Sequence, residues 1–126
     1  MSVSGLPPYD DNNIFARILR GEIPSRKVYE DEWALAFHDI NPQAPVHILV
    51  IPKGRWCGWS DFSAGASEAE IAGFVRAIGT VAREYDADGY RLLANMGAHA
   101  HQEVPHLHVH IFAGRALGPM LVKPRA

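Results

Sequence analysis

The sequence has little of what marks the more specialised classes of protein. Its 126 residues include one cysteine, Cys57, so an intrachain disulfide is impossible and a disulfide-stapled scaffold is excluded. No apolar run approaches the roughly 18 residues of a membrane-spanning helix. The N-terminus lacks the basic and apolar regions of a signal peptide. We therefore expect a soluble protein of a reducing compartment, most simply the cytoplasm.

The sequence also lacks an excess of either sign of charge. Fourteen acidic and 12 basic residues give a formal charge of -2, and 48% of the residues are apolar. A duplex nucleic-acid binder would show a basic stripe, so neither a nucleic acid nor a membrane is expected as a partner. The length suits one domain. We place it at residues 12–118, after a flexible N-terminal arm (1–11) and before a C-terminal tail (119–126).

Two segments have the pattern of helices. Asn12 and Asn13 can cap a short helix that begins at Ile14 and ends before Gly21. Ser67, followed three residues later by Glu70, forms a capping box at the start of an apolar stripe of about five turns. Residues 53–66, rich in Gly and Ser, read as a connection.

Five segments are typical of strands: 27–31, 33–39, 46–51, 90–95 and 104–112. The continuous apolar run at 46–51 indicates the centre of a sheet. Several links are too short for parallel crossovers, so the sheet should be mainly antiparallel. The prediction is an α+β domain of five strands and two helices, with the helices on one face.

Histidine is the one residue type in excess. Of seven histidines, five lie within residues 99–110. His106, His108 and His110 alternate with apolar residues, so on a strand all three imidazoles line one face at a spacing of roughly 7 Å. Imidazole is the side chain that can act as nucleophile, base and acid near pH 7.

Three interpretations of this face compete. It can be a solvated polar face, a metal site with His47 as a further ligand, or a nucleophilic site acting on phosphorus with the flanking imidazoles holding phosphate. The residues favour the third. The small-residue loop at 96–102, with Asn95 before it and Gln102 at its end, can offer amide donors to an anion.

The segment 102–112, with its core His106-Leu107-His108-Val109-His110, closely resembles the signature of the histidine-triad (HIT) family. Upstream segments at 14–18, 22–24, 36–45, 47–53 and 89–91, together with Asn95, resemble the Hint branch of nucleoside phosphoramidases. The resemblance runs from about residue 12 to 118. It implies a HIT-like fold that dimerises into one ten-stranded sheet, and it requires no metal or other cofactor.

The resemblance also implies residue roles. His108 would attack the α-phosphorus, His110 would contact the phosphate, and His106 and His47 would orient the site. Asp39 would hold the ribose hydroxyls. An apolar slot for the purine would be formed by Phe15, Ile18, Ile23, Phe37 and Ile40. The nucleotide would also be contacted by Asn95, Gln102, Glu103 and Val104.

Two departures from the branch lie beside the signature. Many members carry a serine that assists the leaving group at the position of Glu103. His99 and His101 occupy a loop that is usually rich in glycine. We expect them to be exposed, and contact with the phosphate or a leaving group stays open as the alternative.

The expected function is hydrolysis of the P–N bond of purine nucleoside 5′-phosphoramidates, with AMP-lysine or another AMP-amine as substrate. It would pass through a nucleotidyl intermediate on His108 in a homodimer. Three alternatives stay open. They are a dinucleoside polyphosphate hydrolase or nucleotidyl transferase of another HIT branch, a purine-nucleotide-binding module with little turnover, and a metalloprotein.

Overall fold

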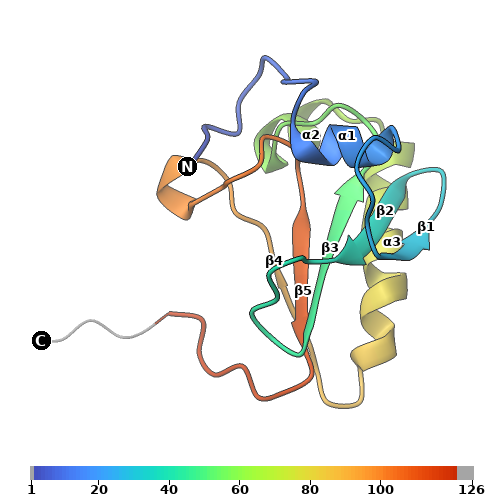
Figure 1. Cartoon of the computed structure of the whole chain (residues 1–126), viewed down its shortest axis with the longest axis vertical. Helices are drawn as coiled ribbons and strands as arrows, with labels where there is room; N and C mark the ends of the chain where they lie inside the picture. Colours follow the sequence, from blue (N-terminus) through green and yellow to red (C-terminus); the bar gives the residue numbers. More distant parts are fainter. Residues whose placement is uncertain (1, 122–126) are drawn as a thin grey trace, which may run out of the picture.

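The computed structural model describes residues 2–121. In chain order its elements are α1 (Ile14–Leu19), β1 (Lys27–Glu30), β2 (Ala34–His38), β3 (Val46–Pro52), α2 (Trp59–Gly65), α3 (Glu68–Ala82), η1 (Arg83–Tyr85), β4 (Arg91–Leu93), η2 (Ala98–Ala100) and β5 (Val109–Ala113). Figure 1 shows the strands arranged as one sheet with the helices packed around it. The part of the predicted tail beyond residue 121 lies outside the described residues.

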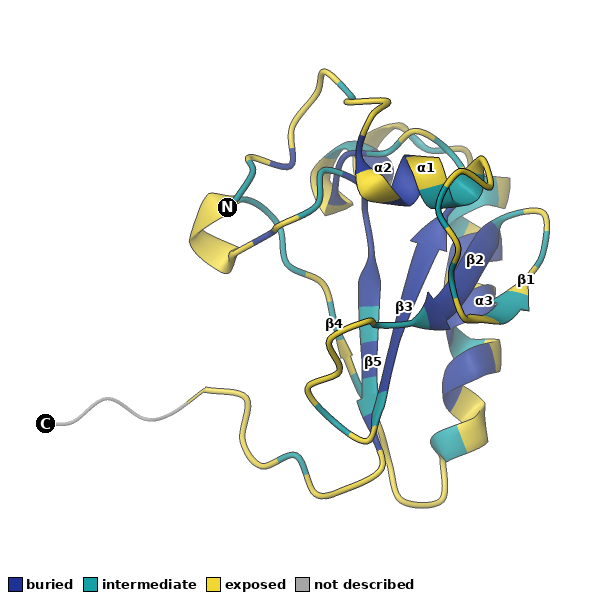
Figure 2. Ribbon diagram, in the orientation of Figure 1, coloured by how far each residue is buried: buried dark blue, intermediate teal, exposed yellow. Residues whose placement is uncertain are grey.

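The five strands form one antiparallel sheet in the order β1-β2-β3-β5-β4. The central position of β3 confirms the expectation from its continuous apolar run, and its middle residues are buried (Figure 2). In the register between β3 and β5, Leu49 lies opposite His110 and His47 lies opposite Phe112. This register brings His47 and His110, 63 residues apart in sequence, onto the same face of the sheet.

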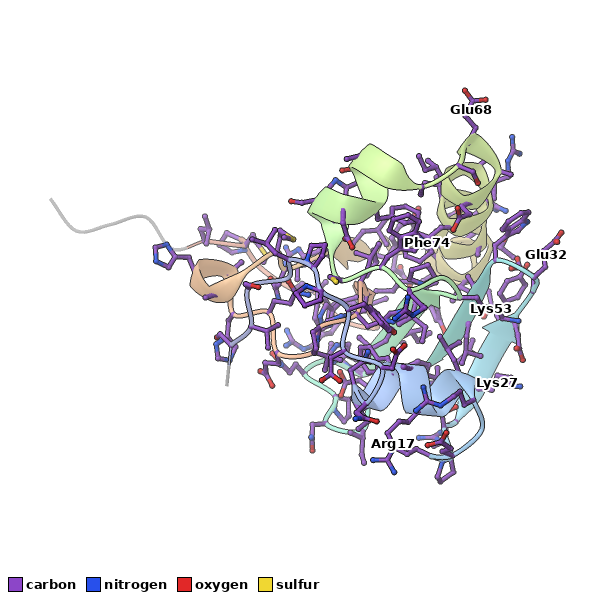
Figure 3. All side chains as sticks on the ribbon, turned by 90° about the horizontal axis from the view of Figure 1, so that it is seen from above. Arg17, Lys27, Glu32, Lys53, Glu68 and Phe74 are labelled. Carbon is purple, nitrogen blue, oxygen red and sulfur yellow. The ribbon has the colours of Figure 1, made fainter. Side chains whose placement is uncertain are left out.

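Helices cover both faces of the sheet, so the expectation that they share one face is wrong. On one face, Phe74 and Ile78 of α3 and Phe62 of α2 pack on the strands. On the other, Phe15 of α1 packs with Leu35, Leu49 and Ile51, among others. Figure 3 shows α1 on the opposite side of the strands from α2 and α3, with Phe74 between α3 and the sheet. The short α1 covers only part of its face and leaves the remainder for a site.

Both predicted helix starts are confirmed. The Asn13 side chain accepts the N–H of Ala16 at 2.9 Å, and the Ser67 hydroxyl accepts the N–H of Glu70 at 3.1 Å. The Glu70 carboxylate accepts the Ser67 N–H in return, also at 3.1 Å. These bonds satisfy N–H groups that have no partner within a helix.

The structure corrects three predicted boundaries. The connection at 53–66 contains a third helix, α2, because the Asp61 carboxylate accepts the N–H groups of Cys57 and Gly58, and Phe62 enters the core. The fourth strand is shorter than predicted. The last strand begins at Val109 rather than residue 104, so His106 and His108 lie on irregular chain leading into it. The alternation of faces persists through that segment, since Leu107 joins the α3 core while His108 faces α1.

The N-terminal arm contains no helix or strand in residues 2–11, but it has defined contacts. The N–H of Val3 donates to the carbonyl of Gln102 at 2.8 Å, and Gly5 is buried. Its last residues approach the histidines through Tyr9.

Within residues 2–121, no helix has the length and apolar character needed to cross a membrane. Cys57 is buried, and burial, reinforced by Asp61, raises the pKa of its thiol to about 11. The thiol therefore stays protonated and unreactive at neutral pH.

Candidate active site

His108 is held as one tautomer. Its Nδ1 lies 2.8 Å from the carbonyl oxygen of His106, and a carbonyl can only accept. Nδ1 therefore carries the proton, and Nε2 is left with a free lone pair. The ring is buried and meets Phe15 edge to face, with 5.0 Å between centroids. An unprotonated imidazole nitrogen held in this way has the form that a nucleophile requires.

The tautomer of His106 is also fixed by a backbone carbonyl, but through Nε2 instead of Nδ1. Its Nε2 lies 2.9 Å from the carbonyl oxygen of Pro52, the last residue of β3, so Nε2 carries the proton. Nδ1 must then accept, and the Tyr9 hydroxyl donates to it at 2.6 Å. His106 is fully buried with both nitrogens bonded. It therefore shapes the site from beneath and does not reach a ligand directly.

His47 and His110 form a directed chain that begins at the backbone. The N–H of Gln43 donates to Nδ1 of His47 at 3.1 Å, so the proton of His47 is on Nε2. That Nε2 lies 2.8 Å from Nδ1 of His110 and donates to it. The proton of His110 is consequently on its own Nε2, a buried atom with no hydrogen-bond partner among the described residues. An unpartnered buried donor is costly unless a ligand accepts from it.

Burial keeps the imidazoles neutral. It lowers the pKa of His106 to about 4 and that of His110 to about 3, with nearby histidines adding to the effect. Burial also lowers the pKa of His108, against the opposing influences of the His106 carbonyl and of the Asp39 and Glu103 carboxylates. At neutral pH the nucleophile candidate is therefore unprotonated, and His110 donates as a neutral ring.

Asp39 is restrained at the end of β2. One carboxylate oxygen accepts the N–H of Asn41 at 2.7 Å, and the other lies 3.3 Å from Nε2 of His47. Burial lowers the pKa of His47 more than Asp39 raises it, so the ring is neutral and this contact is a close polar approach rather than an ion pair. The Asp39 side chain, 18% exposed, retains capacity to accept further hydrogen bonds.

A cleft of about 480 Å³ opens in front of the histidines. Among the predicted site residues it is lined by Asn95, Glu103, Val104, His108 and His110. Gln102 lies outside it. That side chain is buried and donates to the carbonyls of Cys57 and Val104 while accepting the N–H of Gly97, so it anchors the loop instead of facing a ligand.

The predicted apolar slot is only partly assembled. Phe15 and Phe37 are buried and stack edge to face at 5.6 Å, and Phe15 also meets the triad. Ile18 and Ile23 are half-buried. Ile40 is 90% exposed and stands at the surface. The structure thus places the aromatic pair against the histidines and leaves Ile40 to solvent.

Several residues of the site were not predicted from the sequence. Tyr9 gave no signal, because it sits in an irregular arm. Phe112 could have been found, since it continues the alternation of the triad, and it stacks on His110 with 5.5 Å between centroids. Arg91 and Arg115 line the cleft and donate to the backbone carbonyls of Gly118 and Ala116.

One group of side chains has metal-binding spacing. Ligand atoms of Asp39, His47 and His110 lie within 4.8 Å of one another. Both ring nitrogens of His47 and Nδ1 of His110 are already used in the hydrogen-bonded chain from Gln43. A metal here would have to displace the proton between the two rings, so the arrangement fits the hydrogen-bonded chain better than a metal centre.

An antiparallel five-stranded sheet whose last strand is entered through three histidines alternating onto one face is the arrangement of a histidine-triad protein. Residues 20–117 match the HIT domain, so the chain belongs to the HIT family. It is 68% identical to an uncharacterized 13.2 kDa HIT-like protein of Azospirillum brasilense, over 91% of this chain and 96% of that protein. It is 43% identical to the purine nucleoside phosphoramidase of Escherichia coli strain K12, over 88% of this chain and 94% of that protein.

The solved structures agree with the sequence relatives. A histidine triad protein from Clostridium difficile superposes with a TM-score of 0.81 at 40% identity, over 90% of this chain and all (100%) of that chain. This similarity confirms the predicted HIT-like fold.

Proposed function

We propose that the protein hydrolyses the P–N bond of purine nucleoside 5′-phosphoramidates. The observation that carries the proposal is the free lone pair on Nε2 of His108, which the carbonyl of His106 enforces at the cleft. A neutral imidazole nitrogen in that state attacks phosphorus without first losing a proton. The name of the Escherichia coli relative supports the same activity.

The reaction has two steps. Nε2 of His108 forms a bond to the α-phosphorus, and the electron pair of the breaking P–N bond leaves with the amine, which takes up a proton. Water then attacks the phosphorus of the nucleotidyl-His108 intermediate, releases the nucleoside monophosphate and a proton, and restores Nε2. The donor Nε2–H of His110 is suited to a non-bridging phosphate oxygen, where negative charge builds up.

Nucleoside recognition follows from Asp39 and the aromatic pair. A carboxylate can accept hydrogen bonds from two ribose hydroxyls, and Asp39 is held at the edge of the site by Asn41. Phe15 and Phe37 offer an apolar wall to a purine, with Ile18 packed beside them. Few polar groups meet the base in this arrangement, so adenine and guanine should both be accepted.

AMP release from an adenosine 5′-phosphoramidate tests the proposal. The wild type should release AMP, and His108→Asn should lower the rate by about 10³-fold or more while it still binds AMP. Activity that survives in His108→Asn would contradict the nucleophile assignment. Binding of AMP without release by the wild type would point to a nucleotide-binding module. Preference for a dinucleoside polyphosphate would indicate the chemistry of another HIT branch, and loss on adding a chelator would indicate a metal.

We further propose a homodimer in which two sheets join edge to edge. β4 is an edge strand, and the side chain of Leu92 on it is 48% exposed. Next to it lies an apolar hollow of about 580 Å³, lined among others by Trp59, Val75 and Met96. An exposed apolar strand edge favours pairing with another chain. Sedimentation should give the mass of two chains, and Leu92→Glu should give one.

We propose that the protein acts in the cytoplasm, because a reducing compartment keeps a single buried thiol such as that of Cys57 reduced.

A further inference from the structure

Two titratable side chains on the wall of the cleft are not used by the two-step reaction above. His101 and Glu103 line the same cleft as His108 and His110, and Nε2 of His101 lies 3.0 Å from a carboxylate oxygen of Glu103. Both side chains are largely exposed, at 72% and 62%. They therefore stand at the open end of the cleft, where a departing group meets solvent.

The backbone presents this pair from an anchored loop. His101 closes η2 with a left-handed φ of 62°, and its N–H bonds the Ala98 carbonyl at 3.0 Å. Gln102, between the two residues, is buried and held by three side-chain hydrogen bonds. Because Gln102 is anchored, the backbones of its neighbours His101 and Glu103 are held beside the cleft.

A third contact is made by the other ring nitrogen of His101. The Ser2 hydroxyl lies 3.2 Å from Nδ1 of His101, and Figure 1 shows the start of the chain beside η2. When Nδ1 accepts the hydroxyl proton, the ring proton is on Nε2, and that atom faces the Glu103 carboxylate. A protonated ring has an N–H at the same place. In either state an N–H of His101 is directed at Glu103.

We propose that His101 and Glu103 form the proton-donating couple for the leaving amine. The inference rests on the proposed phosphoramidase function. As Nε2 of His108 bonds to phosphorus, the P–N electron pair moves to the amine nitrogen, which receives a proton from the carboxyl group of Glu103. The His101 imidazolium supplies that proton to Glu103 and becomes neutral, and solvent later protonates it again.

The chemistry explains why two residues are needed. An ionised carboxylate can only accept a proton, so it needs a neighbouring N–H acid, such as an imidazolium, to supply the proton that it passes on. An alkylamine anion is too basic to leave unprotonated, so a positioned acid should raise the rate by about 10²- to 10⁴-fold. Glu103 thus transmits a proton that His101 takes up from solvent.

The test compares two leaving groups. AMP joined to an alkylamine needs a proton on departure, and the p-nitrophenyl ester of AMP does not. The rate ratio of amine to ester should fall about 10-fold or more in both Glu103→Gln and His101→Asn. The double variant should fall no further than the worse single one, because the two act as one unit. His99→Asn, an exposed change in the same loop, should leave the ratio unchanged.

Each other result overturns a distinct statement. Equal losses on the two substrates would show that the pair only supports the loop, and an unchanged ratio would show that it donates no proton. Either result leaves the phosphoramidase function standing. No release of AMP from either substrate by the wild type would remove the proposed function, and the couple with it.

Discussion

Residues 106–111, which run into and through the first half of β5, have two faces that depend on different kinds of contact. Leu107, Val109 and Ile111 pack against α3 and its neighbours, where contact is non-directional and depends on volume. His106 and His108, which alternate with them, each depend on a particular carbonyl that fixes which nitrogen carries the proton. A substitution on the apolar face should lower the stability of the fold. A substitution on the histidine face should change the catalytic rate or the pH dependence of the protein.

The largest effect should come from the apolar face. Ile111 is 0% exposed at the centre of the core, so Ile111→Ala should lower the free energy of unfolding by about 4 kcal/mol through lost burial and a residual cavity. AMP release per folded molecule should stay within about twofold of wild type at a temperature where the variant remains folded. Urea unfolding and initial rates measure the two quantities. A large loss of rate in the folded variant would mean that the faces are not separable.

The histidine face should impose a pH limit on stability. His106 has a folded pKa of about 4, against about 6.5 in an unfolded chain. Between these pH values the unfolded chain binds a proton at His106 and the folded chain does not. The contribution of the neutral His106 ring to the free energy of unfolding is therefore fully present above about pH 6.5 and is lost as the pH falls toward 4. From pH 7 to pH 5 this ring alone should remove about 2 kcal/mol.

Urea unfolding at several pH values measures this dependence. His106→Asn, which cannot titrate, should have a shallower slope than wild type between pH 7 and 5. His99→Asn, on the exposed loop, should keep the wild-type slope. Equal slopes in all three proteins would contradict the assignment of a neutral buried His106.

How far each face could be predicted from sequence differs for a physical reason. Apolar alternation and caps are local, so the alternation of faces at 106–110, the capping box at Ser67 and the central β3 were all predicted and are confirmed. The helix α2 was missed because its cap comes from Asp61, within the helix itself, and its composition resembles a loop.

The site depends on contacts that local patterns do not encode. Which nitrogen of His47 carries a proton depends on the backbone of Gln43, and the partner of His106 comes from an arm 97 residues away. Sequence reasoning could place the histidines on one face but could not give their tautomers. Gln102 shows the same limit, because the resemblance marked it for the ligand and the structure uses it as a buried anchor.

A smaller effect should follow from Asp39. If its carboxylate accepts the ribose hydroxyls, Asp39→Asn should raise KM for a ribonucleoside phosphoramidate about 10-fold, since hydrogen bonds to a charged group contribute roughly 1.5–3 kcal/mol. The 2′-deoxy substrate, which lacks one hydroxyl, should show a smaller rise. Equal rises for the two substrates would assign Asp39 to the orientation of His47 alone, from which its oxygen lies 3.3 Å away.

The smallest effect should come from the contact between the arm and the histidine face. Tyr9→Phe removes the hydroxyl that donates to Nδ1 of His106 at 2.6 Å and keeps the ring, which meets His106 edge to face at 5.6 Å. One unsatisfied acceptor should cost about 1 kcal/mol of stability. The turnover rate should fall only about threefold, because the Pro52 carbonyl still fixes the His106 tautomer. Urea unfolding and steady-state kinetics of the single variant measure both. A loss of turnover as large as that of His108→Asn would mean that the tyrosine proton itself takes part in the reaction.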